Sequence, residues 1–291
     1  MYLNSFFQLH PVFFISCMTL LGLAVGSFLN VVIHRLPIMM ERDWRQQCRQ
    51  LLSLDNDIKE ENNGSINLLV PRSRCPHCER MISAIDNIPV ISYCLLRGRC
   101  RNCSHPIPLR YPAIELLSAI VTAFLAWRFG FHVQLVFAAI LSWSLICLAF
   151  IDFEHHFLPD DITLPVLWLG LIINMFGLFT DIYSSLLGAI LGYGILWIIF
   201  VVFKLLTGKE GMGYGDFKLL AMLGAWLGWQ QLPFIILASS LTGVITGLSL
   251  ILFSGQNRST PFPFGPSLAA AGWVALLWGN DITQSYLSLY Q

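Results

Sequence analysis

Residues 133–151 read VQLVFAAILSWSLICLAFI and are followed directly by Asp152. The stretch contains no Asp, Glu, Lys or Arg, and it approaches the roughly 20 apolar residues that an α-helix needs to cross a hydrocarbon core of about 30 Å. In lipid, each backbone polar group must be satisfied within the protein, which makes such a run helical. The sequence therefore predicts a transmembrane helix that ends at a carboxylic acid.

Similar apolar runs recur along the chain, which is 56% hydrophobic and 12% charged, whereas soluble domains are about 25% charged. Seven further spans are expected, at residues 11–33, 113–127, 162–179, 184–206, 217–229, 234–253 and 266–278. The first is interpreted as an anchor, because it lacks the basic n-region and the cleavage site of a secretory signal. The predicted fold class is an all-α polytopic membrane protein with about eight transmembrane helices and a small zinc-ribbon-like cytoplasmic insertion.

The orientation follows from the basic residues, which are retained on the cytoplasmic side of membranes. Twelve of the 17 Lys and Arg residues lie between His34 and Arg110. Three parts are therefore predicted: the first anchor (residues 1–33), a cytoplasmic insertion with a zinc site (34–110) and the remaining transmembrane core (111–291). The equal counts of 17 basic and 17 acidic residues exclude a general affinity for nucleic acid, which requires clustered positive charge.

The insertion contains two C-x-x-C pairs, Cys75 with Cys78 and Cys100 with Cys103. This pattern is typical of a tetrahedral structural zinc site, and a cytosolic location disfavours stable disulfides. A pair of redox dithiols is the alternative. The other four cysteines are interpreted as spectators: Cys17, Cys48, Cys94 and Cys147.

Several acidic residues lie at predicted helix ends, where charge is costly and is often functional. Glu115, Asp160 and Asp161 have a simpler explanation, because acidic groups cap and complement helix N-termini. Asp152 does not, since it closes a helix whose C-terminal dipole disfavours negative charge. Asp216 ends the glycine-rich run at residues 211–216 and precedes a helix on the same membrane side. The dipole argument predicts that Asp216 acts as the base and that Asp152 holds the proton.

Two carboxyl groups on different helices can share one proton and hydrolyse a peptide without a metal ion. The H-E-x-x-H and G-x-S-x-G patterns of other hydrolases are absent from the sequence. Two alternatives remain: a transporter or channel in which the carboxylates line an ion pathway, and a zinc-bearing scaffold. The acids cluster at one membrane face and no internal repeat is present, which disfavours a transporter.

Together these motifs resemble the type IV prepilin peptidase (prepilin leader peptidase/N-methyltransferase) family over nearly the whole chain. The matching segments are residues 26–37 (GSFLNVVIHRLP), both cysteine pairs, Arg110-Tyr111-Pro112 with Glu115, Ile151-Asp152, residues 158–160 (LPD), 209–218 (KEGMGYGDFK) and 263–266 (PFGP). The resemblance implies an intramembrane aspartic endopeptidase in the inner membrane of a bacterium, with Asp152 and Asp216 as the catalytic pair facing the cytoplasm.

The resemblance also implies the substrates and the second activity. Type IV prepilins and the pseudopilins of type II secretion would be cleaved after a leader-terminal Gly, and the new N-terminal residue would be methylated with S-adenosylmethionine as methyl donor. The expected cofactors are thus structural zinc and S-adenosylmethionine, and the expected partners are pilin precursors and membrane lipid. No residue is assigned to the methyl donor, because the insertion contains no recognisable nucleotide-binding fingerprint.

Overall fold

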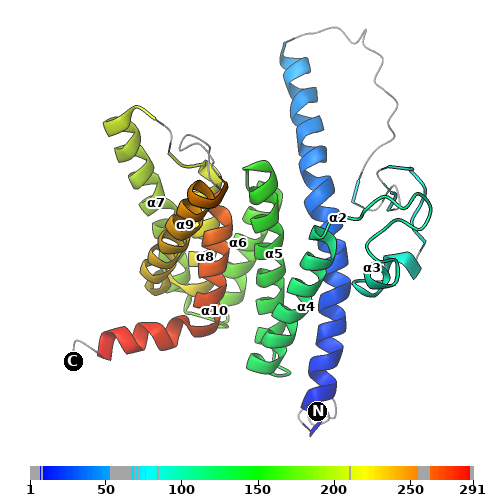
Figure 1. Ribbon diagram of the computed structural model, residues 1–291. Helices are drawn as coiled ribbons and strands as arrows, with labels where there is room; N and C mark the ends of the chain where they lie inside the picture. Colours follow the sequence, from blue (N-terminus) through cyan, green and yellow to red (C-terminus); the bar gives the residue numbers. More distant parts are fainter. Residues whose placement is uncertain are drawn as a thin grey trace. The chain divides into compact units, whose positions relative to one another are not determined.

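A computed structural model describes residues 7, 9–52, 67–68, 70, 73–75, 77–83, 85–209, 211–254 and 263–288 (Figure 1). The chain forms two compact units, Met1–Leu135 and Val136–Gln291. The described residues are mainly helical and contain no strand, only two isolated β-bridges. The predicted all-α class is confirmed.

The first unit is built on the antiparallel pair α2 (Pro11–Leu51) and α4 (Arg110–Phe129). Gly22 and Gly26 of α2 face α4 so closely that a Cβ on Gly26 would lie 2.7 Å from the Cα of Glu115. Small residues at this spacing let two membrane helices approach each other. The cysteine segment between these helices carries the short helices η1 (Ile85–Asn87) and α3 (Ile91–Leu95).

Helix α2 is longer than the sequence analysis predicted. It continues past residue 33 to Leu51, with Pro37 inside it, into the predicted cytoplasmic insertion. Within this extension Arg45 pairs with Glu41 one turn earlier, at 2.6 Å. A pair at this spacing stabilises a solvated helix by roughly 0.2–0.5 kcal/mol, so it supports, but only modestly, the part of α2 beyond the apolar run. Residues 53–66 of that segment lie outside the described residues.

The second unit contains α5 (Val133–His155), whose first turn includes the boundary, α6 (Asp160–Asn174), α7 (Ile182–Thr207), α8 (Tyr214–Leu227), η2 (Trp229–Gln231), α9 (Leu232–Ser254) and α10 (Gly265–Ser288). Helix α8 is its centre: α6, α7, α9 and α10 all pack against it (Figure 1). Residues 219–226 of α8 are all buried. A helix that is apolar on every side belongs in the interior of a bundle.

Two close contacts hold α8 in place. Gly188 of α7 faces Gly224 of α8, and a Cβ on Gly188 would lie 2.2 Å from the Gly224 carbonyl oxygen. On another side, the Trp226 indole covers Gly170 of α6 and donates a hydrogen bond to the Val166 carbonyl at 2.8 Å. Helix α8 therefore has little freedom to shift, which matters because its first turn carries Asp216.

The eight predicted spans each overlap one of the helices α2 and α4–α10, but the count of eight transmembrane helices is not confirmed. Among the described residues, five helices are long and apolar enough to cross a membrane: Pro11–Leu51, Arg110–Phe129, Val133–His155, Ile182–Thr207 and Trp229–Ser249. Helices α6 and α8 have 15 and 14 residues. At 1.5 Å per residue they are about 22 Å long, which is shorter than a hydrocarbon core of about 30 Å.

Candidate active site

Asp152 lies in the last turn of α5 and is buried, with 6% of its surface exposed. Its Oδ2 accepts a hydrogen bond from the backbone N–H of Gly265, at 2.9 Å. Gly265 is the first residue of α10. A carboxyl group that is buried and hydrogen-bonded in this way is held in one orientation, as a reacting group must be.

Asp216 lies in the first turn of α8, and 7% of its surface is exposed. The helix begins at Tyr214, three residues before the predicted start at Phe217, with Gly213 as its N-cap. The carboxyl groups of Asp216 and Asp152 are close enough to interact electrostatically. The structure thus brings together the two acids that the sequence analysis singled out, from helices separated by α6 and α7 in the chain.

The glycines before Asp216 allow close packing against side chains of the same unit. A Cβ on Gly215 would lie 2.8 Å from the Cβ of Leu158, in the segment that follows α5. Likewise, a Cβ on Gly211 would lie 2.7 Å from the ring of Phe203 in α7. The contact of Gly215 sets the first turn of α8 against the segment that follows α5, and that of Gly211 sets the approach to α8 against α7.

Asp160 does not have the capping role predicted for it. The N-cap of α6 is Pro159, and no side chain caps this helix. Both Asp160 oxygens instead accept hydrogen bonds from the Lys218 ammonium of α8, at 2.7 and 2.8 Å. Asp161 is exposed in the same first turn, so its charge complements the helix dipole without capping. The prediction was wrong for Asp160 because it used only neighbouring residues in the sequence, whereas the partner of Asp160 is Lys218 on another helix.

Glu115 was also expected to act at a helix start, and this prediction was wrong. It lies in the second turn of α4, which begins at Arg110, and it is buried. Its Oε2 accepts a hydrogen bond from the N–H of Val90 at 2.8 Å. Val90 has a φ of 59°, a conformation that is costly for a β-branched residue. Glu115 therefore ties the cysteine segment to α4.

The four cysteines of the C-x-x-C pairs form one cluster. Their sulfur atoms all lie within 4.8 Å of one another, and the Sγ atoms of Cys75 and Cys103 are 3.8 Å apart. Sulfurs bound tetrahedrally to zinc at about 2.3 Å would be about 3.8 Å apart, whereas a disulfide needs about 2.05 Å. Hydrogen bonds from the backbone amides of Cys103 and Asn102 lower the pKa of Cys100 to about 7. At Cys103 a backbone hydrogen bond from His105 is outweighed by desolvation and by hydrogen bonds with the other cysteine sulfurs, which raise its pKa to about 12. The geometry of the four sulfurs therefore carries the argument for a metal site.

The two cysteine loops have the same backbone geometry. In each, the first Cys donates its N–H to the carbonyl five residues later, at 3.0 Å for Cys75 and 2.9 Å for Cys100. The residue four positions on has a positive φ, 55° at Glu79 and 57° at Ser104, and donates back to the same Cys at 2.9 Å. Two copies of one loop facing each other present four sulfurs to a common point, which fits a closed metal site better than two redox dithiols.

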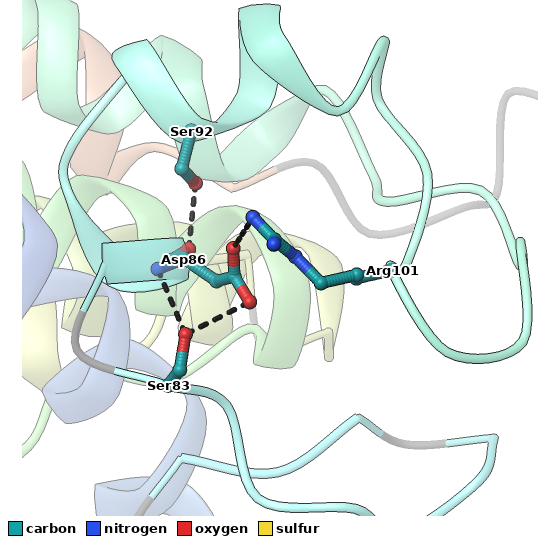
Figure 2. Close-up of polar contacts among 4 residues, drawn as sticks. All are labelled: Ser83, Asp86, Ser92 and Arg101. Carbon is teal, nitrogen blue, oxygen red and sulfur yellow. Dashed lines mark hydrogen bonds and ion pairs between the residues drawn. The ribbon is translucent and has the colours of Figure 1, made fainter.

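Asp86 holds the second loop against the rest of the cysteine segment (Figure 2). Its carboxylate accepts hydrogen bonds from Arg101, at 2.6 Å, and from the Ser83 hydroxyl, at 2.9 Å, while its carbonyl accepts one from the Ser92 hydroxyl at 2.6 Å. Arg101 lies between Cys100 and Cys103 in the sequence. One acidic residue in η1 thus links this loop to α3.

His77, inside the first cysteine loop, is exposed, and the centroid of its ring lies 4.6 Å from that of His105, on which it stacks. In the part of the chain that the structure describes, only the four clustered cysteines form a group able to hold a metal ion. The spectator cysteines lie outside this cluster, Cys17, Cys48 and Cys94 exposed and Cys147 buried. The roles of Gly265 and Asp86 were missed, although residues 263–266 had been noted as a motif.

Comparison with known proteins first gives the class. Residues 20–129 match the Bacterial Peptidase A24 N-terminal domain, and residues 139–248 match the Type IV leader peptidase family, so the chain has the make-up of a leader peptidase.

Curated relatives are similar over almost the full length. A prepilin leader peptidase/N-methyltransferase of Stutzerimonas stutzeri is 53% identical over 97% of both chains. A protein of the same description from Pseudomonas aeruginosa is 52% identical over 96% of this chain and 95% of the relative. Another, from Legionella pneumophila, is 42% identical over 99% of each chain. No solved structure matches. The chain belongs to the prepilin leader peptidase/N-methyltransferase family, which confirms the resemblance seen in the sequence.

Proposed function

We propose that this enzyme is an intramembrane aspartic endopeptidase in which Asp152 and Asp216 are the catalytic pair. The observation that carries the proposal is the meeting of two buried carboxyl groups from α5 and α8. Two buried carboxyl groups that interact are costly to ionise together, so a state in which the pair holds one proton is favoured. An acid and a base are then present together, as in the aspartic proteases.

The chemistry follows from that shared proton. The ionised carboxylate removes a proton from a water molecule, whose oxygen attacks the carbonyl carbon of the scissile peptide bond. The protonated carboxyl group then donates its proton to the amide nitrogen, the C–N bond breaks, and the products are a leader with a new carboxyl terminus and a chain with a free amino terminus. These residues need no metal ion for hydrolysis.

The substrates in this proposal are type IV prepilins and the similar pseudopilins, and the names of the relatives give prepilins as their substrates. The enzyme is a multi-pass membrane protein, and we place the pair at the cytoplasmic face of a bacterial inner membrane, because the basic residues between the spans predict that side. The new N-terminal residue is methylated from S-adenosylmethionine. We assign no residue to the methyl donor and no nucleic acid as a partner.

Cys75, Cys78, Cys100 and Cys103 bind a structural zinc ion in this proposal. Their four sulfurs fit a closed tetrahedral site, and such a site leaves no open position for a substrate. The cysteine segment has few regular elements, so metal binding would supply part of its folding free energy. The division into an anchor (residues 1–33), a zinc-bearing insertion (34–110) and a peptidase core (111–291) stays a prediction.

The test is cleavage of a purified prepilin by detergent-solubilised enzyme, followed by mass spectrometry of both products. Asp152→Asn and Asp216→Asn are each expected to abolish leader removal while the protein remains folded, because each removes one half of the acid and base pair. Asp161→Asn is the matched control, since Asp161 is exposed and makes no part of the pair. Cleavage by either of the first two variants at the wild-type rate would refute the proposal.

A further inference from the structure

The N-terminus of α10 lies against Asp152 of α5. The Gly265 N–H that donates to Oδ2 at 2.9 Å belongs to a residue 113 positions away in the chain, and the contact is buried. The first N–H groups of a helix have no partner within the helix and are free to bind another group. Pro266, the next residue, has no N–H, so no donor from that position competes for the carboxylate.

This contact changes the electrostatics at the end of α5. The carbonyl groups of the last turn of α5 disfavour a negative charge on Asp152, whereas the positive end of α10 favours one. In addition, an unprotonated carboxyl oxygen is a better acceptor than the hydroxyl oxygen of a protonated carboxyl group, so the hydrogen bond from Gly265 favours an Oδ2 that carries no proton. The hydrogen bond therefore favours placing the shared proton on Oδ1 of Asp152 or on the carboxyl group of Asp216.

Position 265 has room only for glycine. A Cβ built there would lie 2.6 Å from Oδ2, 3.0 Å from Cγ and 3.2 Å from Cβ, and all three atoms belong to Asp152. A larger residue at position 265 would thus first displace the proposed catalytic carboxyl group. The absence of a side chain is what lets the backbone amide reach the carboxylate.

We propose that Gly265 is a positioning residue, whose backbone N–H fixes Oδ2 of Asp152 and leaves Oδ1 as the oxygen that gives or takes the proton in the reaction. This role rests on the proposed catalytic function of Asp152. Among the residues that the structure describes, the other ionisable groups that interact with Asp152 are Asp216 and His156, which follows the end of α5 and is exposed. Neither can replace the amide, because Asp216 would repel the ionised carboxylate, whereas His156 is exposed and Asp152 is buried.

The experiment compares Gly265→Ala with Gly247→Ala in the full-length, detergent-solubilised enzyme, using steady-state cleavage of a prepilin. Gly247 is the matched control, because a Cβ there would meet no atom within 4 Å. For Gly265→Ala we expect kcat to fall about 10- to 100-fold, the range for one hydrogen bond to a charged group, with KM unchanged. The control should keep both constants at the wild-type values.

A second variant removes the hydrogen bond without adding an atom and covers the case in which the alanine variant does not fold. Semisynthesis with glycolic acid in place of Gly265 converts the amide N–H into an ester oxygen, and the same fall in kcat is expected. Wild-type kcat in this ester protein, or a change in KM alone, would overturn the positioning role. Asp152→Asn separates the two proposals: if it is inactive while the ester protein is fully active, only the role of Gly265 fails, whereas cleavage by Asp152→Asn refutes the proposed function itself.

Discussion

The contact between Gly188 of α7 and Gly224 of α8 allows a sharp test of how the position of Asp216 is maintained. The change Gly188→Ala would place a Cβ 2.2 Å from the Gly224 carbonyl oxygen, 2.7 Å from its carbonyl carbon and 3.0 Å from the carbonyl carbon of Gly228. All three neighbours are backbone atoms, which cannot rotate away as a side chain can. The two helices must therefore move apart.

The size of the effect follows from these distances. Ordinary van der Waals contact begins at 3.4 Å, so the local separation must grow by about 1.2 Å, the difference from 2.2 Å. Overpacking of this kind costs about 1–3 kcal/mol, which exceeds the gain of up to about 1 kcal/mol from replacing glycine by alanine in a helix. Helix α8 also carries Asp216, and a misplacement of about 1 Å can reduce a rate by about 100-fold.

The assay is thermal unfolding in detergent, followed by tryptophan fluorescence, together with prepilin cleavage at a temperature at which all variants are folded. Trp226 is fully buried in α8 and reports on its packing. Gly194→Ala in the same helix is the control, because a Cβ there would meet no atom within 4 Å while the helix propensity gain is the same. We expect Gly188→Ala to unfold at a lower temperature and to cleave more slowly than Gly194→Ala. Equal stability and equal activity of the two proteins would refute the reasoning.

Two further predictions concern the zinc site and a helix cap. Cys75→Ser should lose bound zinc in metal analysis of the purified protein, because three thiolates bind zinc more weakly than four. Cys94→Ser, which changes a cysteine outside the cluster, should keep the zinc. Zinc retained by Cys75→Ser would contradict the site. Hydrogen bonds from the hydroxyl and the amide of Ser184 hold the pKa of Asp181, the N-cap of α7, below its ordinary value. The stabilisation by this cap is therefore present above the unfolded-state pKa and is lost as the pH falls through the folded-state pKa. Asp181→Ala should remove this part of the acid dependence of the melting temperature. An unchanged dependence would rule out the contribution of the cap.

Much of the architecture could be read from local pattern. Apolar length identified the residues that form α2, α4, α5, α7 and α9, and the paired C-x-x-C spacing identified the cysteine cluster. The expected end of α2 at residue 33 was wrong, because hydropathy marks where a membrane ends and not where a helix does. Helix α8 was predicted as a span, yet its apolar surface is covered by other helices. Composition alone cannot distinguish a helix that faces lipid from one that is buried among other helices.

The acidic residues also differ in whether neighbouring sequence was enough to predict their roles. Asp152 and Asp216 stood out in the sequence because helix-end chemistry and a glycine-rich run depend on immediate neighbours in the chain. Glu115 and Asp160 were assigned to helix starts by that same local reasoning, and the structure instead shows bonds to Val90 and Lys218. Only the packing of α5 against α10 revealed the Gly265 amide at Asp152, because a contact across 113 positions leaves no periodic signal in the sequence. The sequence thus determined which groups are available for chemistry, and the tertiary structure decided which of them meet, because that choice depends on how closely the helices pack.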